Sequence, residues 1–261
     1  MSALAMIQAS DLVAFPLVGI LAGLAIGLTG MGGGVLLTPI MVLLLGVPAQ
    51  AAVANDLVIS LLIKPVGAIA HRNAGTVRRD IVLRLALGSV PAAFTGAVIV
   101  NTVFRHHDSA LKYLIGATLL IAATMMVVRM ATPKADADGA STLRALPTVG
   151  IGVIGGLLVG MTSVGSGSLM LVLLTFAYPR LSSRELVGTD LTQAIPLVAS
   201  AVLGHLLFGD VRLSIVLPVL LGALPGVWFG SQLSTRMPDR ALRPMLVVLV
   251  GASGLRLLGI L

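Results

Sequence analysis

The chain has 261 residues, of which 57% are hydrophobic and only 10% charged, and its formal net charge is +7. Soluble domains carry about 25% charged residues, so this composition argues against a water-soluble domain. The basic residues are scattered singly between apolar blocks without interleaved aromatics, which argues against nucleic-acid binding. The chain has no cysteine, which excludes disulfides, thiol chemistry and thiolate metal sites. The N-terminal sequence MSALAMIQASD has no basic region, so a cleaved signal peptide is not expected.

Ten apolar segments follow in chain order, five in each half. They lie at 12–29, 34–47, 51–71, 80–101 and 110–130, and then at 146–162, 167–178, 185–207, 212–231 and 242–261. Most approach the ~20 residues that span a hydrocarbon core of about 30 Å, and they are apolar nearly all round. We therefore expect an all-α, polytopic transmembrane helix bundle. The predicted units are a first transmembrane repeat (12–130), a polar cytoplasmic linker (131–147) and a second transmembrane repeat (148–261).

The two halves are internal repeats. GLAIGLTGMGGGVL (23–36) aligns with GLLVGMTSVGSGSL (156–169), and rare residues of the later segments match as well. The matched rare pairs are Asp56 and Asp190, His71 and His205, and Pro91 and Pro225. Such matches are hard to obtain by chance in an apolar chain, which indicates a duplication.

The basic residues predict the topology. If all ten segments cross, twelve Lys and Arg residues lie on one side and four on the other, with Lys64 inside the membrane. If 34–47 and 167–178 are re-entrant instead, the same residues divide about evenly, so the positive-inside rule favours crossing. The twelve are Arg72, Arg78, Arg79, Arg84, Arg129, Lys134, Arg144, Arg180, Arg184, Arg236, Arg240 and Arg243; the four are Arg105, Lys112, Arg212 and Arg256. Five crossings per half make the repeats inverted, as in many secondary transporters with midplane sites.

Two glycine-rich stretches occupy matching positions, GLTGMGGGVLLTP (27–39) and GMTSVGSGSLMLV (160–172). Glycine interrupts a helix, and the freed N–H groups at the next half-helix can face an anion. Close helix packing through small residues is the alternative. Because each copy opens a shortened segment, the pattern favours broken helices. The candidate substrate-binding residues are Gly30, Gly32, Gly33, Gly34, Ser163, Gly165, Ser166 and Gly167.

A polar stripe follows the third segment of each half. At 100° per residue, the polar positions of the first copy fall within an arc of about 80°. They are Asp56, Ser60, Lys64, Gly67 and His71, and the second copy has Asp190, Gln193, Val198 in place of Lys64, and His205. Charges near the bilayer centre are costly, so this stripe is expected to face the bundle interior.

Lys64 and Gln193 are further candidates for substrate binding, and Asp56 and Asp190 for proton coupling. A low dielectric disfavours the charged carboxyl, so either aspartate can carry a proton. Lys64, two turns from Asp56, is expected to keep that residue ionised and to leave Asp190 as the better proton carrier. The alternatives are that both aspartates only begin their helices, favourably for the dipole, and that both histidines of the stripe are interfacial.

The paired glycine-rich stretches, ANDL (54–57), GTDL (188–191) and NAGTVR (73–78) resemble the TauE/SafE family of membrane permeases. The resemblance covers roughly residues 15–261. In the second glycine-rich stretch, Ser163 and Ser166 stand where glycine is usual, and Val172 where proline is. The resemblance implies a bacterial-type inner membrane permease for sulfur oxyanions such as sulfite, sulfonates or sulfoacetate.

Taken together, these features predict a secondary transporter for small anions, with a midplane site between the repeats. The chain contains no HExxH, GxSxG or GxxxxGK[ST] motif, so neither an enzyme nor an ATP-driven pump is expected. The expected partners are a small anion and the lipid bilayer; no cofactor, metal or nucleic acid is expected, and a homo-oligomer is left open. A channel-like or structural membrane subunit remains an alternative, as does a permease for a metal cation or a carboxylate.

Overall fold

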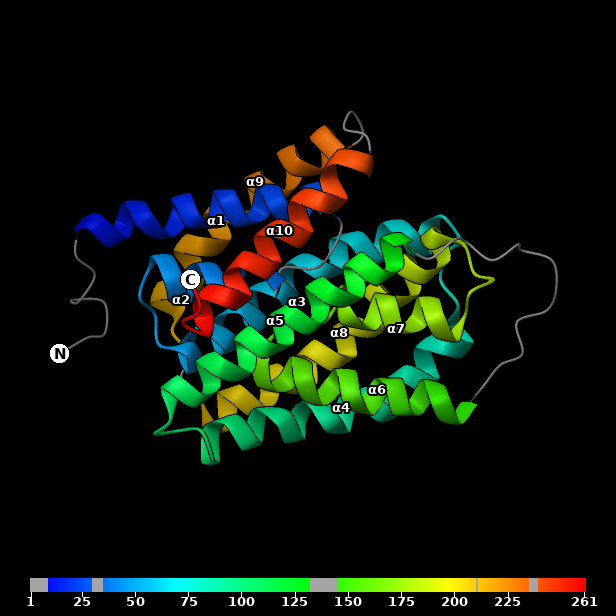
Figure 1. Ribbon diagram of the computed structural model, residues 1–261, viewed down its shortest axis with the longest axis horizontal. Coiled ribbons are helices and arrows are strands. Elements are labelled where there is room, and N and C mark those ends of the chain that lie inside the picture. The colour runs from blue at the N-terminus through cyan, green and yellow to red at the C-terminus, as the bar shows by residue number, and fades with distance from the viewer. Residues whose placement is uncertain (1–8, 30–34, 132–144, 210, 235–238) are drawn as a thin grey trace.

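The computed structural model describes residues 9–29, 35–131, 145–209, 211–234 and 239–261, which form ten α-helices and no strand (Figure 1). The first five are α1 (Ala9–Thr29), α2 (Leu37–Leu44), α3 (Ala49–Asn73), α4 (Arg79–Thr102) and α5 (Asp108–Ala131). The second five are α6 (Ala145–Thr162), α7 (Leu169–Ala177), α8 (Ser183–Phe208), α9 (Leu213–Ser234) and α10 (Asp239–Leu257). Within these residues, five helices are long and apolar enough to cross a membrane. The prediction of an all-α, polytopic bundle is confirmed.

Helices α2 and α7 are short, with 8 and 9 residues. At 1.5 Å per residue, α7 is only about 13 Å long, less than half of a hydrocarbon core. It begins late because Gly165 and Gly167 adopt φ angles of 115° and 112°, a conformation that a right-handed helix does not contain. The glycine-rich sequence therefore shortens the helix by occupying its first turns with loop.

Helices α6 and α7 form a hairpin. Tyr178, directly after α7, hydrogen-bonds through its hydroxyl to Thr148 in the first turn of α6. The start of α6 and the end of α7 therefore lie at the same end of the bundle. The chain runs away from that end in α6 and returns to it through the loop 163–168 and α7. That the segment 167–178 crosses the membrane stays a prediction.

The repeats are inverted, and α3 and α8 show it directly. The backbone N–H of Arg78, after α3, donates to Thr189 Oγ1 near the start of α8 at 3.1 Å. The equivalent N–H of Arg212, after α8, donates to Asn55 Oδ1 near the start of α3 at 2.8 Å. Each helix thus ends where the other begins, so the two run antiparallel.

The ends of the repeats are arranged in the same sense. In Figure 1, α1 begins and α10 ends at the left, whereas α5 ends and α6 begins at the right. Most of the predicted linker, 132–144, lies outside the described residues. Its cytoplasmic position and the exact repeat boundaries stay predictions.

Glycines allow each repeat to pack against the other. Gly23 of α1 faces Ala223 of α9, where an added Cβ would lie 2.9 Å from the Ala223 Cα. The equivalent Gly156 of α6 faces Ser89 of α4, where the same distance would be 2.6 Å. Both distances are shorter than any relaxed carbon–carbon contact, so only glycine permits these helix approaches.

We expect Gly156→Ala to destabilise the protein by about 1–3 kcal/mol, because the methyl group would overpack the α4–α6 interface. Gly150→Ala is the matched control, since an added Cβ there meets nothing within 4 Å and alanine is the better helix former. Thermal unfolding in detergent measures the difference. Equal melting temperatures for the two variants would contradict the packing argument.

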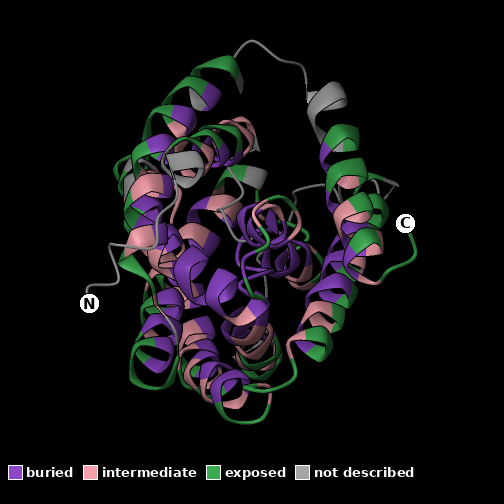
Figure 2. Cartoon of the chain, turned by 90° about the vertical axis from the view of Figure 1, so that its left-hand side faces the viewer, coloured by how far each residue is buried: buried purple, intermediate pink, exposed green. Residues whose placement is uncertain are grey.

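Burial follows the expected membrane pattern. Viewed from the end of the bundle, buried residues gather towards the middle and exposed ones face outward (Figure 2). Many of the exposed residues are large and apolar, among them Leu83 and Leu87 of α4 and Leu217, Leu221 and Trp228 of α9. An apolar outer surface of this kind suits contact with lipid rather than water.

The two repeats are not packed identically. Helix α4 packs along α8, where Ser200 Oγ donates to the Val90 carbonyl at 2.7 Å. The equivalent pair, α9 and α3, meets over a shorter stretch. The bundle therefore departs from exact two-fold symmetry, and the equivalent positions of the two repeats have different surroundings.

Candidate substrate site

Lys64 lies in the interior of α3, where its residue is only 3% exposed. Its ammonium donates to Ser166 Oγ at 3.0 Å. Ser166 belongs to the loop between α6 and α7, so this hydrogen bond joins the two repeats. A buried ammonium has three donors and is stabilised only when they meet acceptors or opposite charge. The Ser166 hydroxyl supplies only one of the acceptors that the ammonium requires.

Asp56 lies about two turns earlier on the same helix and is fully buried. Thr38 Oγ1 of α2 donates to one carboxylate oxygen at 2.5 Å, and Ser60 Oγ donates to the other at 3.3 Å. Both donors stabilise the ionised form of the carboxyl group. Asp56 is the eighth residue of α3, so it does not serve the first turn as a helix-terminal charge.

Asp190 has the equivalent position on α8, again as the eighth residue of its helix, and is 2% exposed. Its Oδ1 is buried without a hydrogen-bond partner in the structure. One turn later, Gln193 donates to Ser89 Oγ of α4 at 2.6 Å, while its own Oε1 has no partner. The α8 side of the site therefore has two buried oxygen atoms, Asp190 Oδ1 and Gln193 Oε1, without a hydrogen-bond partner among the described residues.

The loop 163–168 is buried throughout. Ser163 holds a φ of 58°, which is costly for a residue with a Cβ. The Ser168 hydroxyl is buried without a partner among the described residues, and the Ser163 hydroxyl interacts with Asp56. Irregular backbone at membrane depth is tolerated where protein surrounds it or where it lines a site. The strained backbone of Ser163 and the unpartnered hydroxyl of Ser168 favour the second of these.

The charges of the site form a closed set of three among the described residues. Lys64 interacts electrostatically with both Asp190 and Asp56 and is the charged group that acts on each carboxylate. The sequence predicts the interaction of Lys64 with Asp56 and places no cation on the helix of Asp190. The structure adds the interaction with Asp190, because α3 packs against α8.

The two histidines of the stripe differ. His205 is fully buried, with Nδ1 3.0 Å from Asn101 Nδ2 and Nε2 3.0 Å from the Gly160 carbonyl oxygen. His205 therefore links α8 to α4 and α6 and does not lie at the membrane–water interface. His71 is only partly buried and lies 2.9 Å from Thr76 Oγ1. Neither ring is part of the charged cluster around Lys64.

The structure brings most predicted site residues into one region. Lys64, Asp56, Asp190, Gln193 and the loop with Ser163, Gly165, Ser166 and Gly167 are all buried between the repeats. Gly30, Gly32, Gly33 and Gly34 lie outside the described residues. The sequence prediction did not include Thr38, Ser89 and Ser168 in the site. Thr38 and Ser168 lie within the glycine-rich stretches, which is a usable signal; nothing in the sequence singles out Ser89.

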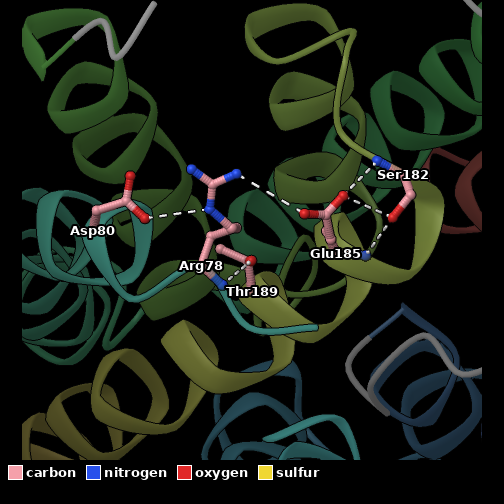
Figure 3. A network of polar contacts seen from close by, with 5 residues as sticks. All are labelled: Arg78, Asp80, Ser182, Glu185 and Thr189. Atoms are coloured by element: carbon pink, nitrogen blue, oxygen red, sulfur yellow. Dashed lines mark hydrogen bonds and ion pairs between the residues drawn. The ribbon is translucent and has the colours of Figure 1, made fainter. Parts of the chain in front are cut away.

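An ionic contact links the repeats at the arginine-rich end of the bundle (Figure 3). Arg78 lies 3.9 Å from Glu185 of α8 and 3.5 Å from Asp80, and Glu185 also completes a capping box with Ser182. The aligned positions in the other repeat are occupied by Ala51 and Ser214. The acidic residues that contact Arg78 therefore have no acidic counterpart at the aligned positions of the other repeat.

Comparison with known proteins adds independent findings. The sequence profile described as "Sulfite exporter TauE/SafE" matches residues 15–257. A Bacillus subtilis (strain 168) protein described as "Probable membrane transporter protein YjnA" is 33% identical over 250 residues, covering 93% of this chain and 98% of the relative. A second protein of that strain, "Probable membrane transporter protein YunE", is 24% identical and covers 92% and 93%. A "Probable membrane transporter protein" from Xylella fastidiosa (strain Temecula1 / ATCC 700964) is 25% identical and covers 84% and 83%. No solved structure matches the chain.

Proposed function

Because this chain belongs to the sulfite exporter TauE/SafE family and is an integral, multi-pass membrane transporter rather than an enzyme, we propose that its substrates are small anions. Sulfur oxyanions, such as sulfite or organosulfonates, are the proposed class. The family description names sulfite. The site has several hydrogen-bond donors that a small oxyanion can contact. The substrate is proposed to bind between the repeats, in contact with Lys64 and the loop 163–168.

One observation carries the proposal. Lys64 is a buried ammonium whose one hydrogen-bond partner among the described residues is the Ser166 hydroxyl, at 3.0 Å. Beside it, the Ser168 hydroxyl is buried without a partner in the described part of the chain, and the buried Ser163 hydroxyl interacts with Asp56. A compact oxyanion can accept hydrogen bonds from all of these donors at once, and charge-assisted bonds of this kind are the stronger ones. The empty cluster therefore has the donors that an oxyanion requires.

Asp190 is proposed to carry the coupling proton. Its Oδ1 has no donor, whereas both oxygens of Asp56 accept hydroxyl hydrogen bonds. The ionised form of Asp190 is thus less stabilised by hydrogen bonds than that of Asp56, so Asp190 takes up a proton more readily. This reasoning reaches the proton carrier predicted from the sequence, but through hydrogen bonding rather than through the position of Lys64.

Flux in proteoliposomes tests the proposal and separates it from the channel-like alternative. We expect sulfite and methanesulfonate uptake to saturate with concentration and to be accelerated by the same anion on the opposite side. A carrier gives both results because one site must reorient for each substrate. Flux that rises linearly without exchange would favour a channel. Saturable uptake of divalent metals or carboxylates alone would replace the proposed substrate class.

A further inference from the structure

The formal charge of the buried cluster follows from its three ionisable residues. Lys64 contributes one positive charge, and Asp56 and Asp190 contribute two negative charges when ionised. The empty site is therefore formally −1. A bound monoanion makes it −2, and a bound dianion makes it −3. Uncompensated charge in a low-dielectric interior is expensive, so each added negative charge needs a proton to accompany it.

The two carboxyl groups are unequal acceptors for that proton. Asp56 is held in its ionised form by Thr38 on one oxygen and by Ser60 on the other. Asp190 has an oxygen with no donor. One proton can therefore be accepted readily, at Asp190, whereas a second, at Asp56, would weaken the existing hydroxyl hydrogen bonds to the ionised carboxylate.

We infer that the site accepts anions of charge −1 together with one proton on Asp190, and that it rejects dianions. With one proton and one monoanion, the loaded site returns to −1, the same formal charge as the empty site. A dianion with one proton leaves it at −2. Hydrogensulfite and alkanesulfonates fit this rule; sulfate and fully ionised sulfite do not. The inference rests on the proposed anion site and narrows its substrate class.

The remaining ionisable groups on the neighbouring helices do not change the count. Helices α6 and α7 contain no charged residue. On α3, α4 and α8, the other ionisable side chains within the described residues lie towards the helix ends or have their own partners: His71, Arg72, Arg79, Asp80, Arg84, Arg184, Glu185 and His205. Lys64 is the charged group that acts on Asp190.

Methanesulfonate and sulfate are the probes, because both are compact tetrahedral oxyanions and they differ by one charge. Binding to the purified full-length protein is measured by calorimetry between pH 6 and 9. We expect sulfate to bind at least about tenfold more weakly than methanesulfonate. We expect methanesulfonate affinity to fall by up to about tenfold per pH unit at the alkaline end, since one proton must bind with the anion.

Two charge variants sharpen the test. Asp190→Asn makes the empty site neutral, so methanesulfonate should bind without a proton and its affinity should lose its pH dependence. Asp56→Asn also makes the empty site neutral but keeps Asp190, so a dianion with one proton returns the site to −1. The sulfate-to-methanesulfonate preference should therefore shift towards sulfate by about tenfold or more in Asp56→Asn alone.

The outcomes distinguish this inference from the proposed function. Equal affinity for both anions, or a pH dependence that is the same in the parent and in Asp190→Asn, would overturn the monoanion rule and leave an anion transporter in place. Absence of binding by either anion in a folded parent protein would overturn the anion site itself. Melting temperatures of both variants establish that the proteins compared are folded.

Discussion

Replacing Lys64 with methionine is expected to weaken anion binding by roughly tenfold to more than a hundredfold. A charge-assisted hydrogen bond contributes about 1.5–3 kcal/mol, and each 1.4 kcal/mol corresponds to a factor of ten in affinity. The substitution removes the cation of the cluster, with which both Asp56 and Asp190 interact. Calorimetric titration with methanesulfonate, followed by flux in proteoliposomes, measures the loss.

The matched control is Lys112→Met, the same substitution at a lysine that is 40% exposed in its side chain and paired with Asp108 at 2.9 Å. It should bind the anion as the parent does. Removing one partner of a buried charge group costs about 3–5 kcal/mol, so Lys64→Met has a companion, Lys64→Met with Asp190→Asn. That double variant keeps the empty site at −1 and still lacks the ammonium. Parent-like binding in both Lys64 variants would assign Lys64 a purely structural role.

Much of the fold was predictable because the local composition of the chain identifies its membrane helices. The ten apolar segments match α1 to α10, and the rare pair Asp56 and Asp190 revealed the duplication. What composition does not contain is where a helix stops. The segment 167–178 is apolar almost throughout, yet α7 begins only at Leu169. The positive φ angles that delay it belong to a loop stabilised by tertiary packing.

The site was predictable as a set of residues but not as a set of contacts. Helical spacing placed Asp56 and Lys64 on one face, and this suggested that they pair. The packing of α3 against α8 brings Lys64 to Asp190 as well. Ser89 could not be identified, because its role depends on α4 packing beside α8 so that Gln193 reaches it at 2.6 Å. Spacing along one helix carries no information on either crossing.

Asp190→Asn is expected to uncouple transport from the pH gradient while sparing exchange of substrate. Asparagine has nearly the shape of aspartate but cannot take up or release a proton. In the parent protein, one proton moves with each monoanion, so a gradient of one pH unit, about 1.4 kcal/mol per proton, supports up to roughly tenfold accumulation. In the variant, the neutral site accepts the anion without a proton, and no accumulation should follow from the same gradient.

Proteoliposomes loaded at one pH and diluted into another measure both properties, with labelled methanesulfonate as the substrate. Asp108→Asn is the control, because the Asp108 side chain is 41% exposed, pairs with Lys112 and is not part of the buried cluster. It should respond to the gradient as the parent does. If Asp190→Asn accumulates substrate with the parent's response, the proton travels on another group, and the unfilled Oδ1 of Asp190 is a structural feature without a coupling role.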